Sequence, residues 1–271
     1  MGRFNGVLIA TDYDDTLVNR EKQVPQRSLD ALRRFTDQGG RFTIASGRGA
    51  EAIRPCLEGL PVNAPVIVAN GTQIYDFAAE KLVYEAYLPQ EARADFAQVL
   101  RDFPRVAVEV YARGQLYCVN PNLVTAEHLR ITRQTAREVR LEEIPAPWVY
   151  AKFEEENAYL RRIQDHLRER FPGRYEAIFS NTYLLEVAGK GSGKGPGVLR
   201  LAELLGVRRE DIYCAGDNEN DLSMLRAAAV SFTPEHSTPI AMETAGVIVC
   251  DCDEGALADV VAYLEQKYEN K

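Results

Sequence analysis

The sequence predicts an α/β fold in which a doubly wound parallel sheet carries an inserted α+β domain. Two observations predict the core: short apolar runs alternate with amphipathic helical segments in the first third of the chain, and the same alternation returns in the last third. A third observation predicts the insertion, because the middle of the chain alternates apolar and polar residues as antiparallel strands do. We therefore expect core segments 1–86 and 187–271 around an inserted domain of residues 87–186.

The first core segment alternates three apolar runs with two helical patterns. The first helical pattern stops at Gly39-Gly40, and glycine commonly ends helices. Strands separated by helices of this length imply right-handed βαβ units. In order, we expect a strand over Val7 to Ala10, a helix over Arg27 to Gln38, a strand over Arg41 to Ala45, a helix over Ala50 to Leu57 and a strand over Val66 to Ala69.

The last third repeats this pattern, and the middle breaks it. In the last third we expect helices over Gly197 to Leu205, Asp221 to Ala228 and Ala256 to Tyr268, and strands over Asp211 to Ala215 and Val247 to Val249. In the middle we expect half-exposed strands over Val106 to Val119, Trp148 to Phe153 and Tyr183 to Val187, and helices over Glu91 to Phe103 and Ala158 to Phe171. The expected connections to the core are 74–88 and 185–189.

The composition is that of a folded, acidic protein. In 271 residues, Lys and Arg number 32 and Asp and Glu number 40, so the formal net charge is −8. Such a chain has no global basic field, and we expect no nucleic-acid partner and no attraction to a membrane surface. The apolar run before Asp12 is shorter than a signal-peptide core, and no stretch reaches membrane-spanning length, so we expect a cytoplasmic protein.

Two acidic clusters, far apart in the sequence, each follow an apolar run. Asp12 and Asp14 belong to the first cluster, and Asp217 and Asp221 belong to the second. Because adjacent parallel strands bring their carboxyl ends to one edge of a sheet, we expect these carboxylates to meet. Like charges packed together need a cation, and hard oxygen ligands suit Mg²⁺. The sequence therefore predicts a magnesium site at this edge.

Asp12-Tyr13-Asp14 offers two carboxylates that can take different roles. A carboxylate can attack phosphorus to give an acyl-phosphate, and a second acid can protonate the leaving oxygen and then activate water. The alternative is an Asp-rich capping turn, which this segment on its own favours. Around Asp217 and Asp221 the capping alternative is weaker, because three acids and two amides exceed what a cap needs.

Polar turns also follow the second and third predicted strands. In Ser46-Gly47-Arg48, the hydroxyl and the backbone N–H groups can bind a phosphoryl oxygen, whereas Arg48 fits a substrate contact and an ion pair equally well. Asn70-Gly71 is a common turn dipeptide, but its position at the same sheet edge as the acids favours a role in the site.

The glycine-rich segment 189–195 carries two lysines and opens a helix. A lysine there can hold a transferring phosphate as a point charge, and either Lys190 or Lys194 could be that residue. The alternative of a nucleotide-binding P-loop fails twice. Ala188 stands where its first glycine is required, and Gly195 stands where its Ser or Thr is required.

Taken in order, these segments resemble the four motifs of the haloacid dehalogenase (HAD) superfamily of phosphohydrolases. Their distribution resembles its Cof-type, sugar-phosphatase-like branch with a type IIB cap. The resemblance covers nearly the whole chain, and its specificity lies above all in the run from Gly216 to Asp221. It implies a Rossmann-like core, a cap over residues 87–186 and Mg²⁺ as cofactor.

The resemblance also implies a role for each site residue. Asp12 would be the nucleophile that becomes aspartyl-phosphate, Asp14 the general acid and base, and Lys194 the motif lysine. The implied phosphate-binding residues are Ser46, Gly47, Arg48, Asn70, Gly71 and Asn220, and the implied metal-binding residues are Asp12, Asp14 through its carbonyl, Asp217 and Asp221.

One residue departs from the family pattern. Glycine usually follows the second aspartate, and this chain has Asp15 there. Glycine permits positive φ at little cost, and aspartate tolerates it better than most other residues. The change also adds a negative charge, so we expect activity to be retained while the affinity for metal and the proton affinity of Asp14 are altered.

The leading hypothesis is a Mg²⁺-dependent phosphatase that acts on a small phosphorylated metabolite, either a sugar phosphate or a phosphorylated cofactor. One alternative is a phosphomutase of similar fold, in which the phosphoryl group returns to a substrate hydroxyl. Another is a catalytically quiet protein that binds phosphometabolites, an alternative suggested by Asp15.

Overall fold

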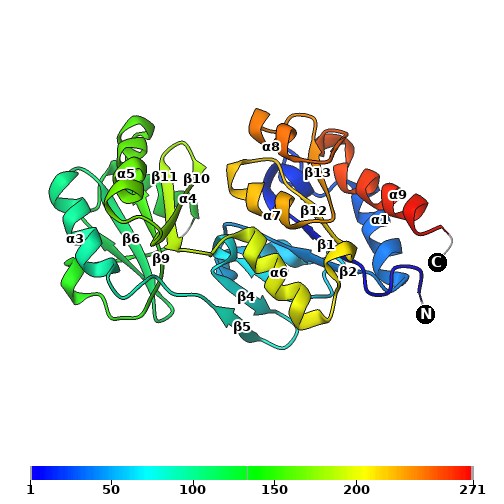
Figure 1. The fold of residues 1–271 in the computed structure, drawn as a ribbon, viewed down its shortest axis with the longest axis horizontal. Helices are drawn as coiled ribbons and strands as arrows, with labels where there is room; N and C mark the ends of the chain where they lie inside the picture. The colour runs from blue at the N-terminus through cyan, green and yellow to red at the C-terminus, as the bar shows by residue number, and fades with distance from the viewer. Residues whose placement is uncertain (1, 133, 270–271) are drawn as a thin grey trace. The chain divides into compact units, whose positions relative to one another are not determined.

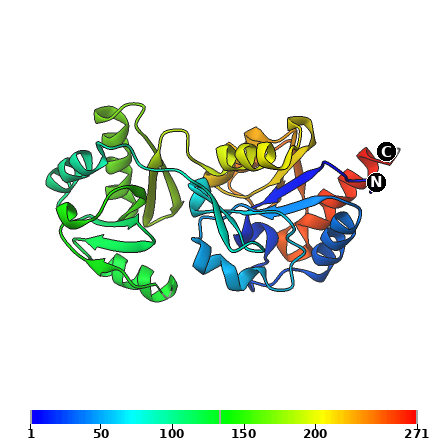
Figure 2. The same ribbon diagram turned by 90° about the horizontal axis from the view of Figure 1, so that it is seen from below.

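The computed structural model describes residues 2–132 and 134–269, and the chain divides into two compact units. Unit 1 comprises residues 1–84 and 193–271, and unit 2 comprises residues 85–192. Each unit has its own sheet with helices packed against it (Figures 1 and 2). The α/β fold with an inserted α+β domain is therefore confirmed.

Unit 1 is built on a parallel sheet with the strand order β14-β13-β12-β1-β2. An antiparallel hairpin beside it is joined by a parallel bridge between Ala45 and Ile67. The strands of the parallel sheet are β1 (Leu8–Thr11), β2 (Arg41–Ile44), β12 (Ile212–Ala215), β13 (Val230–Pro234) and β14 (Val247–Val249). The second sheet contains β3 (Val66–Val68), β4 (Gln73–Asp76) and β5 (Lys81–Glu85).

Helices cover both faces of the parallel sheet. Successive residues of β1 point to opposite faces, and since both sets are apolar, both faces need a covering layer. Ile9 packs with Leu32 and Val260 in one core, and Leu8 packs with Met224 in the other. The first face is covered by α1 (Gln26–Asp37) and α9 (Ala256–Lys267), and the second by α6 (Lys194–Leu205) and α7 (Leu222–Ala227). Shorter helices are α2 (Ala50–Ile53), η2 (Arg54–Leu57) and α8 (Pro239–Thr244).

Unit 2 is built on a mainly antiparallel sheet with the strand order β10-β11-β9-β6-β7-β8. Phe96, Phe153 and Leu160 belong to the core that joins one face of this sheet to α3 and α5. The strands are β6 (Ala107–Ala112), β7 (Gln115–Val119), β8 (Arg137–Glu138), β9 (Trp148–Glu154), β10 (Tyr175–Asn181) and β11 (Leu184–Gly189). The helices are α3 (Ala92–Asp102), α4 (Leu123–Thr132) and α5 (Asn157–Arg170).

The central strand β9 differs from the half-exposed strand that the sequence predicts. All seven residues of β9 are buried, including Lys152 and Glu154. Their polar side chains are covered by α4, whose His128 has Nε2 3.2 Å from Lys152 Nζ. The sequence does not predict α4, because its buried residues are polar. Residues 185–189, expected as a connection, form part of β11.

This buried polar face shifts the protonation of its side chains. Burial and the neighbouring Glu109 raise the pKa of Glu154 to about 8, against smaller opposing effects of the Thr125 hydroxyl and Lys152. Burial and the nearby charge of Lys152 lower the pKa of His128 to about 4. The His128 imidazole is therefore uncharged near neutral pH.

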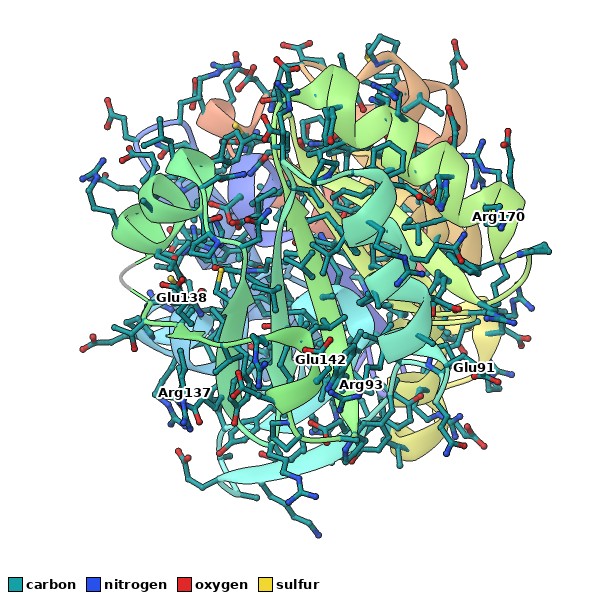
Figure 3. The ribbon with its side chains drawn as sticks, turned by 90° about the vertical axis from the view of Figure 1, so that its left-hand side faces the viewer. Glu91, Arg93, Arg137, Glu138, Glu142 and Arg170 are labelled. Carbon is teal, nitrogen blue, oxygen red and sulfur yellow. The ribbon has the colours of Figure 1, made fainter. Side chains whose placement is uncertain are left out.

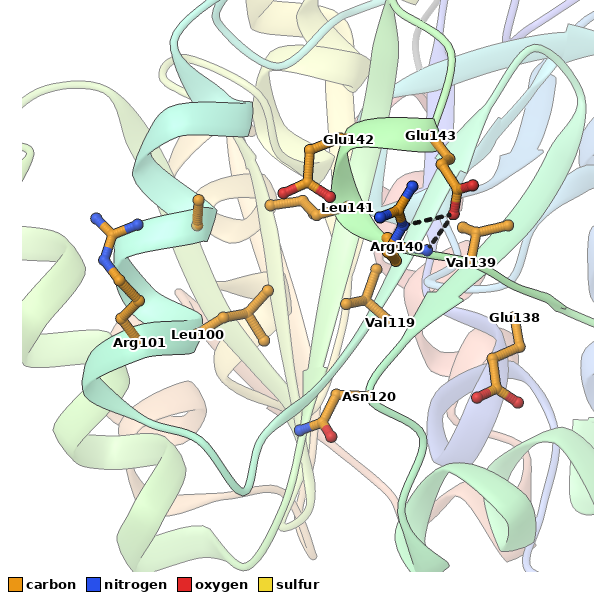
Figure 4. Close-up of a pocket in the computed structure, with 11 residues that line it drawn as sticks. Leu100, Arg101, Val119, Asn120, Glu138, Val139, Arg140, Leu141, Glu142 and Glu143 are labelled. Carbon is orange, nitrogen blue, oxygen red and sulfur yellow. Dashed lines mark hydrogen bonds and ion pairs between the residues drawn. The ribbon is translucent and has the colours of Figure 1, made fainter.

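The surface of unit 2 is hollowed beside α3 (Figure 4). The hollow has a volume of about 820 Å³ and is lined by basic and acidic side chains, among them Arg101, Arg140 and Glu142. Basic and acidic side chains also occur together elsewhere in unit 2, for example Arg93 and Glu91 (Figure 3). This mixture of charges favours no single class of ligand.

Within residues 2–132 and 134–269, no helix has both the length and the apolar composition that spanning a membrane requires.

Candidate functional site

The polar turns of unit 1 follow the carboxyl ends of neighbouring strands. β1 pairs in parallel with both β12 and β2, so Asp12, Asp217 and Ser46 leave the sheet at the same edge. The backbone N–H of Asp12 donates to the carbonyl of Ala215 at 2.9 Å and ties the first turn to β12. The adjacency of strands that are distant in sequence therefore assembles this site.

Three carboxylates and one ammonium group form its buried centre. Oxygens of Asp12, Asp217 and Asp221 lie within 4.8 Å of one another. Lys194 is fully buried, and its Nζ donates to Asp12 Oδ1 and to Asp221 Oδ1, the latter at 2.6 Å. One lysine does not balance three carboxylates, so this centre favours a cation.

Burial and the closeness of these charges also shift the pKa values of the residues at this centre. Burial raises the pKa of Asp12 well above its usual value, although Lys194 opposes the shift and the other two carboxylates reinforce it. Burial and the charge of Asp221 raise the pKa of Asp217 to about 6, against the Thr16 hydroxyl and Lys194. Burial acts to lower the pKa of Lys194, but Asp12 and Asp221 outweigh it, and the pKa is raised. Lys194 is therefore a permanent cation.

The donor set fits a hard divalent metal ion. Asp12 and Asp217 present carboxylate oxygens, the ligand type that Mg²⁺ prefers. Asp221 is more committed within the protein, because its Oδ2 accepts from the backbone N–H groups of Asp217 and Asn218 at 3.0 and 3.1 Å while its Oδ1 accepts from Lys194. Asp221 thereby fixes the turn that carries Asp217.

Asp14 forms an ion pair with Arg48, apart from the three carboxylates of the buried centre. Arg48 Nε and Nη2 donate to its two carboxylate oxygens at 2.9 and 2.8 Å, and Lys22 Nζ lies 3.4 Å away. Burial acts to raise the pKa of Asp14, but Arg48 and then Lys22 outweigh it, and the pKa is lowered. Arg48 therefore forms an ion pair with Asp14, and its contact with a substrate stays a prediction.

Asp15 stands where the resemblance leads us to expect glycine, and it adopts a left-handed conformation. Its φ is 57° and its ψ is 13°. The carboxylate pairs with Lys22 at 3.1 Å, and the carbonyl lies 3.0 Å from His236 Nε2. The additional charge therefore has a lysine partner, and it contributes only a small part of the raised pKa of Asp217.

The remaining polar turns meet beside the acidic centre. Ser46 is buried, and its Oγ accepts from the backbone N–H of Arg48 at 3.1 Å. Asn220 Nδ2 donates to Asn70 Oδ1 at 3.1 Å. A Cβ at Gly47 would lie 3.1 Å from Nδ2 of the Asn70 side chain, so the Ser46 turn approaches the Asn70 turn closely.

Gly71 brings the Asn70 turn against the beginning of α6. Its φ is +86°, and a Cβ there would lie 2.0 Å from the carbonyl oxygen of Gly193. Lys194 is the next residue, so this close approach fixes the backbone of the buried lysine. Lys190, the alternative that the sequence left open, lies in unit 2 and pairs with Glu176 at 2.8 Å.

Sequence reasoning missed several residues that support the acidic centre. The Thr16 hydroxyl donates to Asp217 Oδ1 at 2.9 Å, and both the backbone N–H and the hydroxyl of Thr238 donate to the Asp217 carbonyl. Thr16 could have been found, because it directly follows the first acidic cluster. Thr238 and His236 follow β13, which the sequence does not predict, so no signal pointed to them.

We expect Gly71→Ala to destabilise unit 1, because the new Cβ would collide with the Gly193 carbonyl as well as strain the backbone. The free energy of unfolding should fall by about 2 kcal/mol more than in Gly59→Ala. Gly59 is the matched control, because its φ is also positive and no atom lies within 4 Å of the position that a Cβ would take there. Urea unfolding followed by circular dichroism measures both variants, and equal losses would contradict the close approach.

Comparisons with known proteins agree along most of the chain. The family model for haloacid dehalogenase-like hydrolases matches residues 9–261. A 5-amino-6-(5-phospho-D-ribitylamino)uracil phosphatase of Bacillus subtilis is 26% identical over 92% of this chain and 95% of its own length. A pyridoxal phosphate phosphatase of Escherichia coli is 23% identical over 94% of this chain and 97% of its own length.

Solved structures show the same fold. A haloacid dehalogenase-like hydrolase from Bacteroides thetaiotaomicron superposes with a TM-score of 0.79 at 25% identity, covering 95% of this chain and 99% of that one. A HAD subclass IIB sugar phosphatase superposes with a TM-score of 0.82 at 20% identity, covering 95% and 98%. The resemblance inferred from the motifs is thus confirmed, and the chain belongs to the haloacid dehalogenase-like hydrolases.

Proposed function

We propose that this protein is a Mg²⁺-dependent phosphatase that hydrolyses a small organic phosphate through an aspartyl-phosphate on Asp12. The observation that carries the proposal is the buried contact of Lys194 with Asp12 and Asp221, next to Asp217. Two relatives are named as phosphatases of a phosphoribityl compound and of pyridoxal phosphate, and a structural neighbour is named as a sugar phosphatase. We infer a phosphorylated cofactor, cofactor precursor or sugar as substrate.

Asp12 is the proposed nucleophile. Its carboxylate must be ionised to attack phosphorus, and Lys194 favours that state by direct hydrogen bonding. The same ammonium group would offset negative charge on the phosphoryl group during transfer. Ser46, Gly47, Asn70, Gly71 and Asn220 would bind the phosphoryl oxygens through hydroxyl, amide and backbone N–H groups.

Asp12, Asp217 and the carbonyl of Asp14 would hold Mg²⁺, with Asp221 acting directly or through the turn that it fixes. When bound, the ion would supply neutralisation of phosphoryl charge. Thr16 and Thr238 would keep Asp217 oriented, because they donate hydrogen bonds to its carboxylate and its carbonyl. The protein thus contributes a positioned set of oxygen donors.

Asp14 is the proposed general acid and base. The Arg48 fork and Lys22 stabilise its ionised form, which is the form required to activate water against the aspartyl-phosphate. To protonate a leaving oxygen, Asp14 must first take up a proton, and this requires the contact with Arg48 to loosen. Arg48 would then be available to contact the anionic substrate, so both interpretations of this residue can apply at different steps.

We expect Asp12→Asn to lower the rate of phosphate release by at least ~10³-fold while the protein stays folded, because the amide cannot attack phosphorus. Inorganic phosphate would be measured with a panel of phosphorylated metabolites and one aryl phosphate, with Mg²⁺ or with a chelator. Near-wild-type release by the variant would remove Asp12 as the nucleophile. Wild-type product that retains its phosphoryl group would indicate a mutase, and ligand binding without turnover would indicate a binding protein.

We expect Lys194→Gln to abolish turnover and to lower the free energy of unfolding by about 3–5 kcal/mol, because it leaves two buried carboxylates without their cation. Lys190→Gln is the matched control, since Lys190 is largely exposed in its pair with Glu176 and such pairs contribute little. Steady-state kinetics and urea unfolding would be run on both. Loss of turnover in Lys190→Gln alone would transfer the role to that residue.

We expect Arg48→Met to move the acidic limb of the kcat profile to higher pH. Arg48 lowers the pKa of Asp14, so removing it raises that pKa, and the ionised base is then lost at a higher pH on acidification. The measurement is kcat against pH with saturating substrate and metal. Arg54→Met, which breaks an exposed pair with Glu80, serves as the control and should leave the limb unmoved. An unshifted limb in Arg48→Met would separate Asp14 from the proton transfer.

A further inference from the structure

Unit 2 contains a second buried cluster of charged and metal-ligating side chains, formed by Glu109, His128, Lys152 and Glu154. Glu109 on β6 is directly opposite Lys152 on β9, and Glu154 lies two residues further along β9, so all three point to one face of the sheet. His128 reaches this face from α4. The opposite face of the same sheet carries the apolar core with α3 and α5.

Three ligand atoms converge in this cluster. His128 Nε2 lies 3.7 Å from Glu109 Oε2 and 3.9 Å from Glu154 Oε1. One oxygen of each carboxylate and the imidazole nitrogen all lie within 4.8 Å of one another. Zn²⁺ binds histidine nitrogen and carboxylate oxygen at about 2.0–2.2 Å, so two ligand atoms around one ion lie ~3–4 Å apart. The two separations from His128 Nε2 lie in this range, so His128 is placed to share an ion with either carboxyl group.

The two carboxylates lack the hydrogen bonds that buried carboxylates require. Glu109 and Glu154 are fully buried, and in the part of the chain that the structure describes none of their four oxygens has a hydrogen-bond partner. Lys152 Nζ stays 3.8 Å from Glu109 and contacts His128 Nε2 at 3.2 Å. The Thr125 hydroxyl donates to Asn122 Oδ1 at 3.2 Å, and its proximity to Glu154 favours the ionised form of that carboxyl group. Buried carboxyl groups without hydrogen bonds are rare in native proteins, and their usual missing partner is a bound water molecule or a bound ion.

The attachment of α4 gives a second, independent indication. The buried residues of this helix are Thr125 and His128, both polar, whereas its apolar Leu123 and Ile131 are 89% and 56% exposed. Its other apolar residues, Val124 and Leu129, are half-buried but do not belong to the apolar core of unit 2, so apolar burial anchors this helix only in part. A bond from His128 to an ion held by the sheet would supply a further anchor.

We propose that Glu109, His128 and Glu154 bind a divalent transition-metal ion such as Zn²⁺, which pins α4 to the sheet of unit 2. The mixed nitrogen and oxygen donor set favours Zn²⁺ over Mg²⁺ or Ca²⁺. Binding of the ion requires Lys152 to give up its contact with His128, because the lone pair of Nε2 can serve only one of the two cations. This site does not depend on the proposed function of unit 1.

The test is a Zn²⁺ titration of the untagged full-length protein in excess Mg²⁺, with hydrogen exchange of residues 123–132 as a second readout. Wild type should bind one Zn²⁺ that slows exchange across α4. His128→Gln and Glu154→Gln should weaken this binding by ~100-fold and lose the protection. Asp217→Asn, which alters the acidic centre of unit 1, should keep both.

The matched controls are His166→Gln and Glu127→Gln. His166 lies on α5, and Glu127 is an exposed neighbour of His128 that pairs with Arg130, so neither substitution should affect Zn²⁺ binding. Lys152→Met removes the competing ammonium group and should bind Zn²⁺ more tightly, a result that does not depend on the folding of the ligand variants. Equal binding by wild type and His128→Gln, unchanged exchange of α4, or weaker binding by Lys152→Met would each overturn it.

Discussion

The organisation of unit 1 depends on the buried ammonium group of Lys194, which contacts Asp12 and Asp221. It allows Asp12 and Asp221, which are separated by most of the chain, to lie together away from water. Charges at that depth are tolerated only when they are paired and held in place. The pairing in turn requires backbones to approach closely. Gly71 admits the start of α6, and a Cβ at Gly216 would lie 2.5 Å from that of Asp221.

Much of the fold could be predicted from the sequence because hydrophobic periodicity reports burial directly. The strands and helices expected in the first and last thirds of the chain lie within a few residues of their predicted bounds. The parallel pairing of β1 with β12 explains why Asp12 and Asp217 meet. β13 was missed because its five residues alternate too briefly and end in Pro234. α4 was missed because polar residues make its contacts with the sheet, and a pattern of apolar residues cannot reveal that kind of packing.

The site was predictable in composition but not in contacts. Spacing after strands indicated which residues would gather, whereas the choice between Lys190 and Lys194 depended on where the inserted unit ends. The partner of Asp14 depended on the orientation of the Arg48 fork, which no local pattern encodes. Asp15 shows the converse, because its left-handed backbone was foreseeable from the glycine that usually stands there, whereas its partner Lys22 was not.

The strand order of unit 1 has a consequence for how the protein is made on the ribosome. β1 lies between β2 and β12, and β12 is synthesised about 200 residues later. At roughly 5–20 residues per second, one edge of β1 waits for at least ~10 s before its partner emerges. Unit 2 is continuous in sequence and can fold during this interval. During this interval the nascent chain exposes the unpaired edge of an apolar strand, which is a template for mispairing that chaperones would have to cover.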